Sequence, residues 1–409
     1  MIVKPLAAFA LRATSAAGSA IAALWTFPAM LCSAFLVAWG AEAAQFLISQ
    51  GLALAALAWL QTLPEFAVEA VIAWDAGKDP ATKHLAIANL TGAIRLLIGL
   101  GWPMIYFVAA WSGRKTGPRL PDIVLEREHA VEVMGLIGPL LWFAVIWWKR
   151  TFGVVDAAVL IALYVVYLWV LWQCPPRDHE ELDEAPAVSR WAYKLGGTRR
   201  TVAIVALFVA GGGLLIVTTH PFLDSMLALA QSVGMSPFFA VQWFAPFLSE
   251  FPEILSTFNW ARRRKGPMAL MNLVSSNINQ WTVLAAMIPL LYGWSHQRAH
   301  GTWASFTFDG EQEVEIALTV AQSVLAVLLL MDLRFKWHDA ASLFVLWLAQ
   351  FLVPHWRDEI SVIYLAWCGW LVLLFVLRRR ALSAPRVFLE VFRENRAQRA
   401  RQKARSPGQ

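Results

Sequence analysis

The sequence predicts an all-α polytopic membrane protein with two inverted five-helix repeats, broken helices and one extra C-terminal span. Three observations predict this fold. The 409 residues are 58% hydrophobic and 15% charged, whereas soluble proteins contain about 25% charged residues. Several windows of about 20 residues are almost free of charge, and this is the length that crosses the hydrocarbon core. Landmarks in the first half of the chain also recur in the second half at a nearly constant offset.

The hydropathy of the chain predicts about eleven spans. Their expected limits are 18–39, 46–74, 84–111, 130–148, 154–173, 201–219, 236–261, 267–292, 314–331, 339–354 and 359–377. The first apolar run is too long for a signal-peptide core and has no clear cleavage site, so we count it as a span. The expected units are a first repeat at 1–173, a linker at 174–200, a second repeat at 201–354, the extra span at 355–377 and a basic tail at 378–409.

Positive charge differs between the two sides of the predicted membrane. Loops three-four, five-six, seven-eight and nine-ten carry 4, 5, 4 and 2 lysines or arginines, and the opposite segments carry two or fewer each. The positive-inside rule therefore places the N-terminus outside and the C-terminus in the cytoplasm. We expect the chain in the cytoplasmic (inner) membrane, with its basic tail solvated near anionic lipid.

The two halves resemble each other at four landmarks. These are "FGVVDAAVL" at 152–160 with "FKWHDAASL" at 335–343, Asn89 with Asn272, Glu132 with Glu315, and "LPEF" at 63–66 with "FPEI" at 251–254. The first three pairs share an offset of 183 and the last has an offset of 188. Because five spans is an odd number, the second copy enters the membrane from the opposite side. Inverted repeats are typical of transporters, whose site lies at the repeat interface near the midplane.

Each copy contains a Pro-Glu pair within an expected span, at Pro64–Glu65 and at Pro252–Glu253. Proline leaves the carbonyl four residues earlier without its helical partner. In lipid, such a break is tolerated only where it faces protein or a watery cavity, and carboxylates within spans usually mark ion paths. Freed carbonyls beside carboxylates suit Ca²⁺ or Na⁺. The alternative is an ordinary interfacial helix start, and the recurrence at matching depth in both copies argues against it.

A polar stripe marks the helix that follows the second break. Asn272, Ser276 and Gln280 lie at i, i+4 and i+8. The other polar residues of this stretch are Ser275, Asn277 and Asn279. Hydrogen bonding between helices would explain part of this stripe, but six polar residues in nine favour the lining of a site. The first copy retains only Asn89 of the equivalent stripe.

Two further ionisable residues lie inside the first repeat. Glu69 lies one turn after Glu65 on the same helix face. Its expected role is that of a second ligand, a proton relay or a structural glutamate with an ion-pair partner. Arg95 lies midway along the third span. It is a tethered cation that pairs with a site glutamate, a structural ion-pair partner of a residue such as Glu69, or a side chain that snorkels to the interface.

At these residues the chain resembles the cation/calcium antiporter superfamily, which includes the sodium/calcium exchangers. The resemblance covers residues 18–354 and rests on two breaks, two stripes and the approach to the second break. These are "LQTLPE" at 60–65, "LSEFPE" at 248–253, "ANLTGAIRLL" at 88–97, "MNLVSSNINQ" at 271–280 and "VGMSPFFAVQWF" at 233–244. The resemblance implies that Glu65 and Glu253 are the central Ca²⁺-binding carboxylates. It places Gln61, Thr62, Ser249 and Ser276 at positions that line the ion sites.

The chain also departs from the family pattern. The ligand serine and the final asparagine of the first stripe are Ala93 and Leu97, and the final acid of the second stripe is Gln280. A break serine is replaced by Glu250. Several ligands of the Na⁺ type are therefore missing, while a glutamate is added.

These observations predict a secondary-active cation antiporter that exchanges Ca²⁺ for Na⁺ or H⁺ by alternating access. A second hypothesis is a proton-coupled or other-cation exchanger in which Arg95 replaces a bound cation, and a third is a non-transporting membrane scaffold or sensor. Enzymatic activity is not predicted, because the histidines lie in loops or at span ends, unlike the ligands of an intramembrane metalloprotease, and no P-loop is present. The expected partners are inorganic cations and the lipid bilayer, with no nucleic acid and no cofactor.

Overall fold

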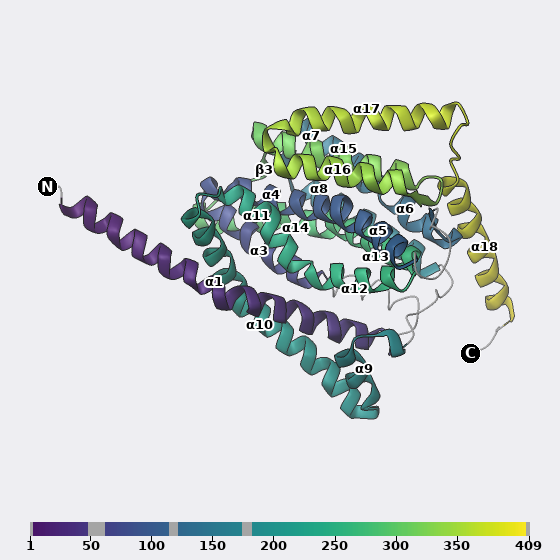
Figure 1. The fold of residues 1–409 in the computed structure, drawn as a ribbon, viewed down its shortest axis with the longest axis horizontal. Helices are drawn as coiled ribbons and strands as arrows, with labels where there is room; N and C mark the ends of the chain where they lie inside the picture. The colour runs from purple at the N-terminus through teal and green to yellow at the C-terminus, as the bar shows by residue number, and fades with distance from the viewer. Residues whose placement is uncertain (1–2, 48–61, 114–121, 174–181, 406–409) are drawn as a thin grey trace.

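Apolar helices form most of the protein, as the hydropathy predicts. The structure, a computed structural model, describes residues 3–47, 62–113, 122–173 and 182–405 (Figure 1). The first repeat contains α1 (Val3–Ala44), α3 (Leu63–Lys78), α4 (Lys83–Leu96), α5 (Trp102–Gly113), α6 (Ala130–Gly135), α7 (Ile137–Lys149) and α8 (Val154–Gln173). The second repeat contains α10 (Gly197–Ser232), α11 (Pro237–Ser249), α12 (Phe251–Arg262), α13 (Gly266–Asn279), α14 (Ala285–His300), α15 (Gly310–Leu330) and α16 (Trp337–Leu352). The remaining helices are α9 (Ala187–Lys194), α17 (Arg357–Val376) and α18 (Ala384–Arg405).

Four short strands join the two repeats. Strand β1 (Asp122–Val124) pairs antiparallel with β4 (Arg334–Lys336), and β2 (Thr151–Phe152) pairs antiparallel with β3 (Phe306–Thr307). In the first pair Ile123 is opposite Phe335. Their repeat equivalents at the offset of 183 are Phe306 and Phe152, which are opposite each other in the second pair. The two pairs are thus equivalent under the repeat, although the sequence did not predict strands. Each pair also joins two loops that were predicted to lie on the same side of the membrane.

Other local features recur at the same offset. A π-helical segment spans Leu97–Gly101 in the first copy and Gln280–Leu284 in the second. In the matched "DAA" motifs, Asp156 accepts a hydrogen bond from the Gly153 backbone over 2.8 Å, and Asp339 accepts one from the Lys336 backbone over 3.1 Å. Such side-chain acceptors satisfy the free N–H groups at a helix start. The sequence match in these motifs therefore reflects a shared helix cap.

Seven helical stretches of the described residues are long and apolar enough to cross a membrane. The expected count of eleven is not confirmed, and residues 48–61 of the span predicted at 46–74 lie outside the described residues. The span predicted at 236–261 is α11 followed by α12, and the one at 267–292 is α13, a π-helical segment and α14. The span predicted at 201–219 is longer than expected, since α10 continues through Pro221 to Ser232.

The C-terminal tail differs from the solvated segment that the sequence predicted. Helix α18 packs on α6 and on the turn Arg127–His129. Val391 is buried and Phe392 lies 6.1 Å from Trp169 between ring centroids. The apolar side chains spaced along this charged helix explain the packing.

The packing of the bundle brings the two copies together. Helices α1 and α10 lie side by side on one side of the molecule, and α16 and α17 lie on the other (Figure 1). Between them α3 packs on α14, and α4 packs on α11. The break-bearing helix of each copy is therefore close to the polar-stripe region of the other copy.

Candidate functional site

Both predicted central glutamates occupy the first turn of a helix that begins at a break. Pro64 and Pro252 are in the first two positions of α3 and α12, where a missing N–H is tolerated. Glu65 and Glu253 follow them and are 2% and 7% exposed. The helix dipole favours negative charge at both places. Each Pro-Glu pair therefore begins a helix, as the interfacial alternative expected, but both pairs lie inside the protein.

Helix α13 supplies the hydrogen bonds to Glu253. Asn272 Nδ2 donates to Glu253 Oε1 over 2.7 Å, and the Ser276 hydroxyl donates to the same oxygen. These two residues belong to the stripe that the sequence predicted. The i, i+4 spacing places both on the face of α13 that meets α12.

Gln280 connects the two copies at the centre of the site. Its Nε2 donates to Glu65 Oε1 over 3.1 Å and also to Glu250 Oε1. The Glu65 and Glu250 carboxyls therefore meet at the same amide nitrogen, and Glu253 is close enough for its charge to act on both. Three carboxyl groups from the two breaks thus converge on one buried region. Gln280 begins a π-helical segment, a feature often found at functional sites.

The first copy uses its glutamates differently. Asn89 is equivalent to Asn272 in the repeat, but its Nδ2 donates to Glu69 Oε2 over 2.7 Å. Glu69 lies one turn after Glu65 and is completely buried. Asn89 thus donates to a second glutamate of its own copy, while Glu65 accepts its hydrogen bond from Gln280 of the other copy.

The other predicted residues surround this cluster. Thr62 precedes α3, and its carbonyl accepts from the Phe66 backbone over 3.0 Å. Ser249 is buried at the end of α11 and donates to the Pro246 carbonyl over 3.2 Å. Asn277 Nδ2 donates to Gln280 Oε1 over 2.9 Å, which orients the bridging amide. Gln61 lies outside the described residues.

The cluster is rich in acidic side chains. Glu65, Glu69, Glu250 and Glu253 are buried, and no lysine, arginine or histidine of the described residues forms an ion pair with any of them. The amide oxygens Asn89 Oδ1 and Asn277 Oδ1 receive no hydrogen bond within the same residues. Nor does any group of three or more His, Cys, Asp or Glu side chains there have the arrangement of a metal site. The site is instead a mixed carboxylate, amide and hydroxyl set, which can neutralise a cation that enters it.

A second buried polar network lies between α4, α11, α15, α16 and α17. Arg95 Nη2 pairs with Glu315 Oε2, and Arg357 Nη1 lies 2.5 Å from Glu315 Oε1. Gln242 Nε2 donates to Glu315 over 2.7 Å, and Arg95 Nη1 donates to Gln350 over 3.1 Å. Arg95 and Glu315 are both 0% exposed. The sequence had pointed to Glu315 only as the repeat equivalent of Glu132, and it missed this network.

This network corrects the expectations for Arg95. Arg95 is a buried ion-pair partner, as one of the three alternatives expected, but its partner is Glu315 on α15 and not Glu69 or another glutamate of the break cluster. Its complete burial also contradicts snorkelling to the interface. The helical wheel explains the outcome, because Arg95 points roughly 120° away from Asn89 around α4.

Comparisons with known proteins agree with this architecture. A family model described as sodium/calcium exchanger protein matches residues 18–173 and 203–354. A crystal structure of the H⁺/Ca²⁺ exchanger CAX is 30% identical, covers 92% of this chain and 91% of its own, and has a TM-score of 0.82. The sodium-calcium exchanger NCX_Mj, soaked with 100 mM Na⁺ and 10 mM Sr²⁺, is 16% identical, covers 83% and 99% of the two chains, and has a TM-score of 0.53, which shows a shared fold. A search of curated proteins found no match.

Proposed function

Because the chain belongs to the sodium/calcium exchanger protein family, we propose that it is a secondary-active antiporter that exchanges Ca²⁺ for protons. The observation that carries this proposal is the convergence of Glu65, Glu250 and Glu253 from two inverted breaks. Hard carboxylate and amide oxygens are the ligands that Ca²⁺ prefers. Alternating access then requires that the same buried groups face each side of the membrane in turn.

In this proposal Glu65 and Glu253 bind Ca²⁺ directly. Glu250 adds a third carboxyl group, and Ser276, Asn272 and Gln280 hold the carboxylates in place through the hydrogen bonds described above. The lining is completed by Thr62, Ser249, Asn89 and Asn277, and the role of Gln61 stays a prediction from the sequence. Glu69 lies behind the site, against Asn89, at a position suited to a proton relay.

Protons are proposed as the coupling ion for two reasons. Adjacent buried carboxyl groups repel each other unless a cation or a proton lies between them, and Glu65 and Glu250 are such neighbours. Departure of Ca²⁺ therefore leaves groups that protons can neutralise. The positions that supply ligands of the Na⁺ type in the family are Ala93, Leu97 and Gln280 here, which also favours protons over Na⁺. The structure similar at 30% identity is that of an exchanger of H⁺ and Ca²⁺.

We further propose that the chain resides in the cytoplasmic membrane with its C-terminus inside. The distribution of positive loops supports this orientation. The pairing of β1 with β4 supports the grouping of loops three-four and nine-ten on one side.

The test is an ion-substitution flux assay on purified protein in proteoliposomes. An imposed pH gradient is expected to drive Ca²⁺ uptake without Na⁺, and a Na⁺ gradient at uniform pH is expected to drive none. Uptake driven by Na⁺ alone would contradict proton coupling. Absence of flux under every gradient would favour the non-transporting scaffold.

A further inference from the structure

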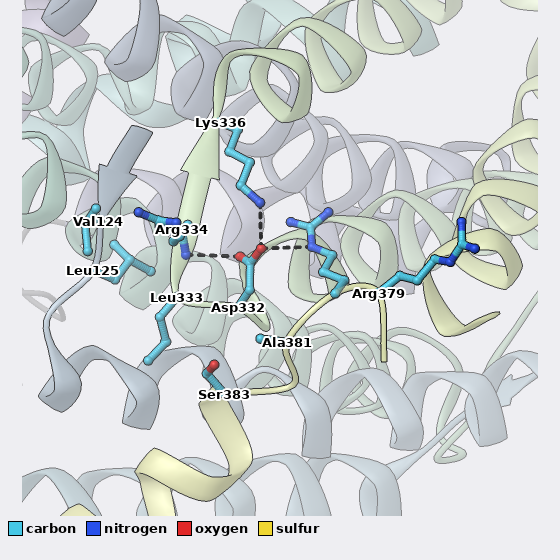
Figure 2. A pocket seen from close by; sticks show the side chains of 10 residues that line it. Val124, Leu125, Asp332, Leu333, Arg334, Lys336, Arg379, Ala381 and Ser383 are labelled. Carbon is cyan, nitrogen blue, oxygen red and sulfur yellow. Dashed lines mark hydrogen bonds and ion pairs between the residues drawn. The ribbon is translucent and has the colours of Figure 1, made fainter. Parts of the chain in front are cut away.

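A basic cavity of about 490 Å³ lies beside the strand pair β1–β4. None of its lining residues belongs to the carboxylate cluster. Its volume falls within the range of small-molecule sites, about 300–1,000 Å³. Figure 2 shows its side chains, which come from three segments of the chain. The lining residues are Val124, Leu125, Asp332, Leu333, Arg334, Lys336, Arg379, Arg380, Ala381 and Ser383.

Positive charge exceeds negative charge around this cavity. Four cationic side chains and one carboxylate line it. Asp332 holds two of the cations in place, because Lys336 Nζ and Arg380 Nε lie 2.8 and 3.0 Å from its Oδ2 (Figure 2). Asp122 and Asp339 contact Arg334 and Arg380 at 3.4 and 3.5 Å, and still leave one positive charge in excess.

The two outer arginines are available to a ligand. The Arg334 side chain is 54% exposed, and Arg379 is also exposed. Arg379 follows a tight turn in which Arg378 adopts φ 54°, and the Arg379 backbone donates to the Leu374 carbonyl over 2.9 Å. This turn closes the end of α17. Arg380, which follows it, reaches Asp332 and Asp339, whereas the Arg379 side chain points away from Asp332 (Figure 2).

The cavity lies at the ends of candidate spans, at the depth of the lipid headgroups. Two candidate spans end at its edge, at Leu330 and at Val376. Side chains directly after a span lie among the lipid headgroups. Large apolar residues are exposed next to the cations, namely Val124 at 54%, Leu377 at 56% and Leu382 at 54%. An amphiphile could therefore place a charged group on the arginines and its chains on the apolar surface.

We propose that this cavity binds the phosphate-bearing headgroup of an anionic phospholipid. Arg334 contacts the phosphate, while Arg379 at the rim and Lys336 and Arg380, held by Asp332, supply the positive field. Basic pockets at the ends of spans recognise anionic headgroups in this way. Free phosphate shares the charged group but lacks the chains that the exposed apolar residues would contact.

The test measures binding of short-chain lipids to the purified full-length protein in neutral detergent. The probes are dioctanoyl phosphatidylglycerol, dioctanoyl phosphatidylcholine and inorganic phosphate. Phosphatidylglycerol is expected to bind, and the other two to bind at least tenfold more weakly. Replacement of both outer arginines, Arg334→Gln with Arg379→Gln, is expected to weaken binding about 25-fold, since each surface cation contributes about fivefold.

Two other variants separate the cavity from general surface charge. Ala381→Trp fills the cavity without changing its charge and is expected to weaken binding at least tenfold. Arg386→Gln removes a cation that is 83% exposed and outside the lining, and is expected to change binding less than twofold. Equal binding by the double variant and the unchanged protein would overturn the proposal, as would equal losses in the double variant and Arg386→Gln. Binding of free phosphate as tight as that of the lipid would instead assign a soluble anion.

Discussion

Gln280 in the second repeat donates a hydrogen bond to Glu65 in the first repeat, over 3.1 Å between Nε2 and Oε1. The same amide contacts Glu250, so one side chain spans both breaks. Asn277 Nδ2 donates a hydrogen bond to the side-chain oxygen Oε1 of Gln280 and so orients this amide. The arrangement orients acidic groups from both copies toward one buried point.

The first prediction concerns Glu253. Glu253→Gln is expected to lower Ca²⁺ flux in proteoliposomes at least tenfold, because Ca²⁺ affinity depends on the number of charged ligands and one carboxylate is lost. The fold is expected to survive, since the glutamine can still accept the hydrogen bonds from Asn272 and Ser276. Glu313→Gln is the control, because this glutamate pairs with the exposed Arg150 away from the site. Unchanged flux in Glu253→Gln would remove Glu253 from the ion site.

The second prediction concerns pH. Protons and Ca²⁺ compete for the same carboxylates in the proposed mechanism, so Ca²⁺ binding releases protons. The apparent Ca²⁺ affinity is therefore expected to fall as pH falls, by up to about tenfold per pH unit for each competing proton. Isothermal titration in two buffers of different ionisation enthalpy would count the released protons. An affinity independent of pH, with no proton release, would contradict proton coupling.

The third prediction concerns the buried pair of Arg95 and Glu315. Glu315→Gln is expected to destabilise the protein by about 3–5 kcal/mol, because it leaves two arginines without their shared carboxylate. Arg95→Gln is expected to be milder, since Arg357 still neutralises Glu315. The double variant, in which both Arg95→Gln and Glu315→Gln are made, should be more stable than Glu315→Gln alone. Melting temperatures in detergent would provide the comparison.

The same variants test the role of Arg95 in transport. Because Arg95 contacts Glu315 and not the break cluster, Arg95→Gln is expected to leave the ion dependence of flux unchanged. A Na⁺ dependence that appears in this variant would show instead that Arg95 replaces a transported cation.

The fourth prediction concerns the crossing of α4 and α11. A Cβ at Gly92 would collide with the backbone carbonyl of Gln242, so the two helices can approach only through glycine. Gly92→Ala is expected to destabilise the protein by about 1–3 kcal/mol. At Gly212 on α10 nothing lies within 4 Å of the added carbon, so Gly212→Ala should stabilise by about 0.5–1 kcal/mol. Similar melting temperatures for the two variants would contradict the close crossing.

Much of the architecture follows from periodicity and repetition in the sequence. Pro64 and Pro252 indicated where α3 and α12 begin, because proline is tolerated in the first turn of a helix but not inside its hydrogen-bond ladder. The recurring Asp156 and Asp339 marked equivalent helix starts, and the structure places them at equivalent caps. The strands were not predictable, since two or three residues carry no usable alternation.

The sequence by itself determined that the chain is a helical membrane protein with two opposed copies and an acidic break in each. Hydropathy, proline chemistry and a repeat of odd span number are local properties, and they suffice for these conclusions. Only the tertiary structure decided which partners the buried charges take. It brought Gln280 to Glu65, Asn89 to Glu69 and Arg95 to Glu315, across separations of 215, 20 and 220 residues. Such choices depend on how helices rotate and cross, because a buried charge requires a partner but its position in the sequence does not specify which one.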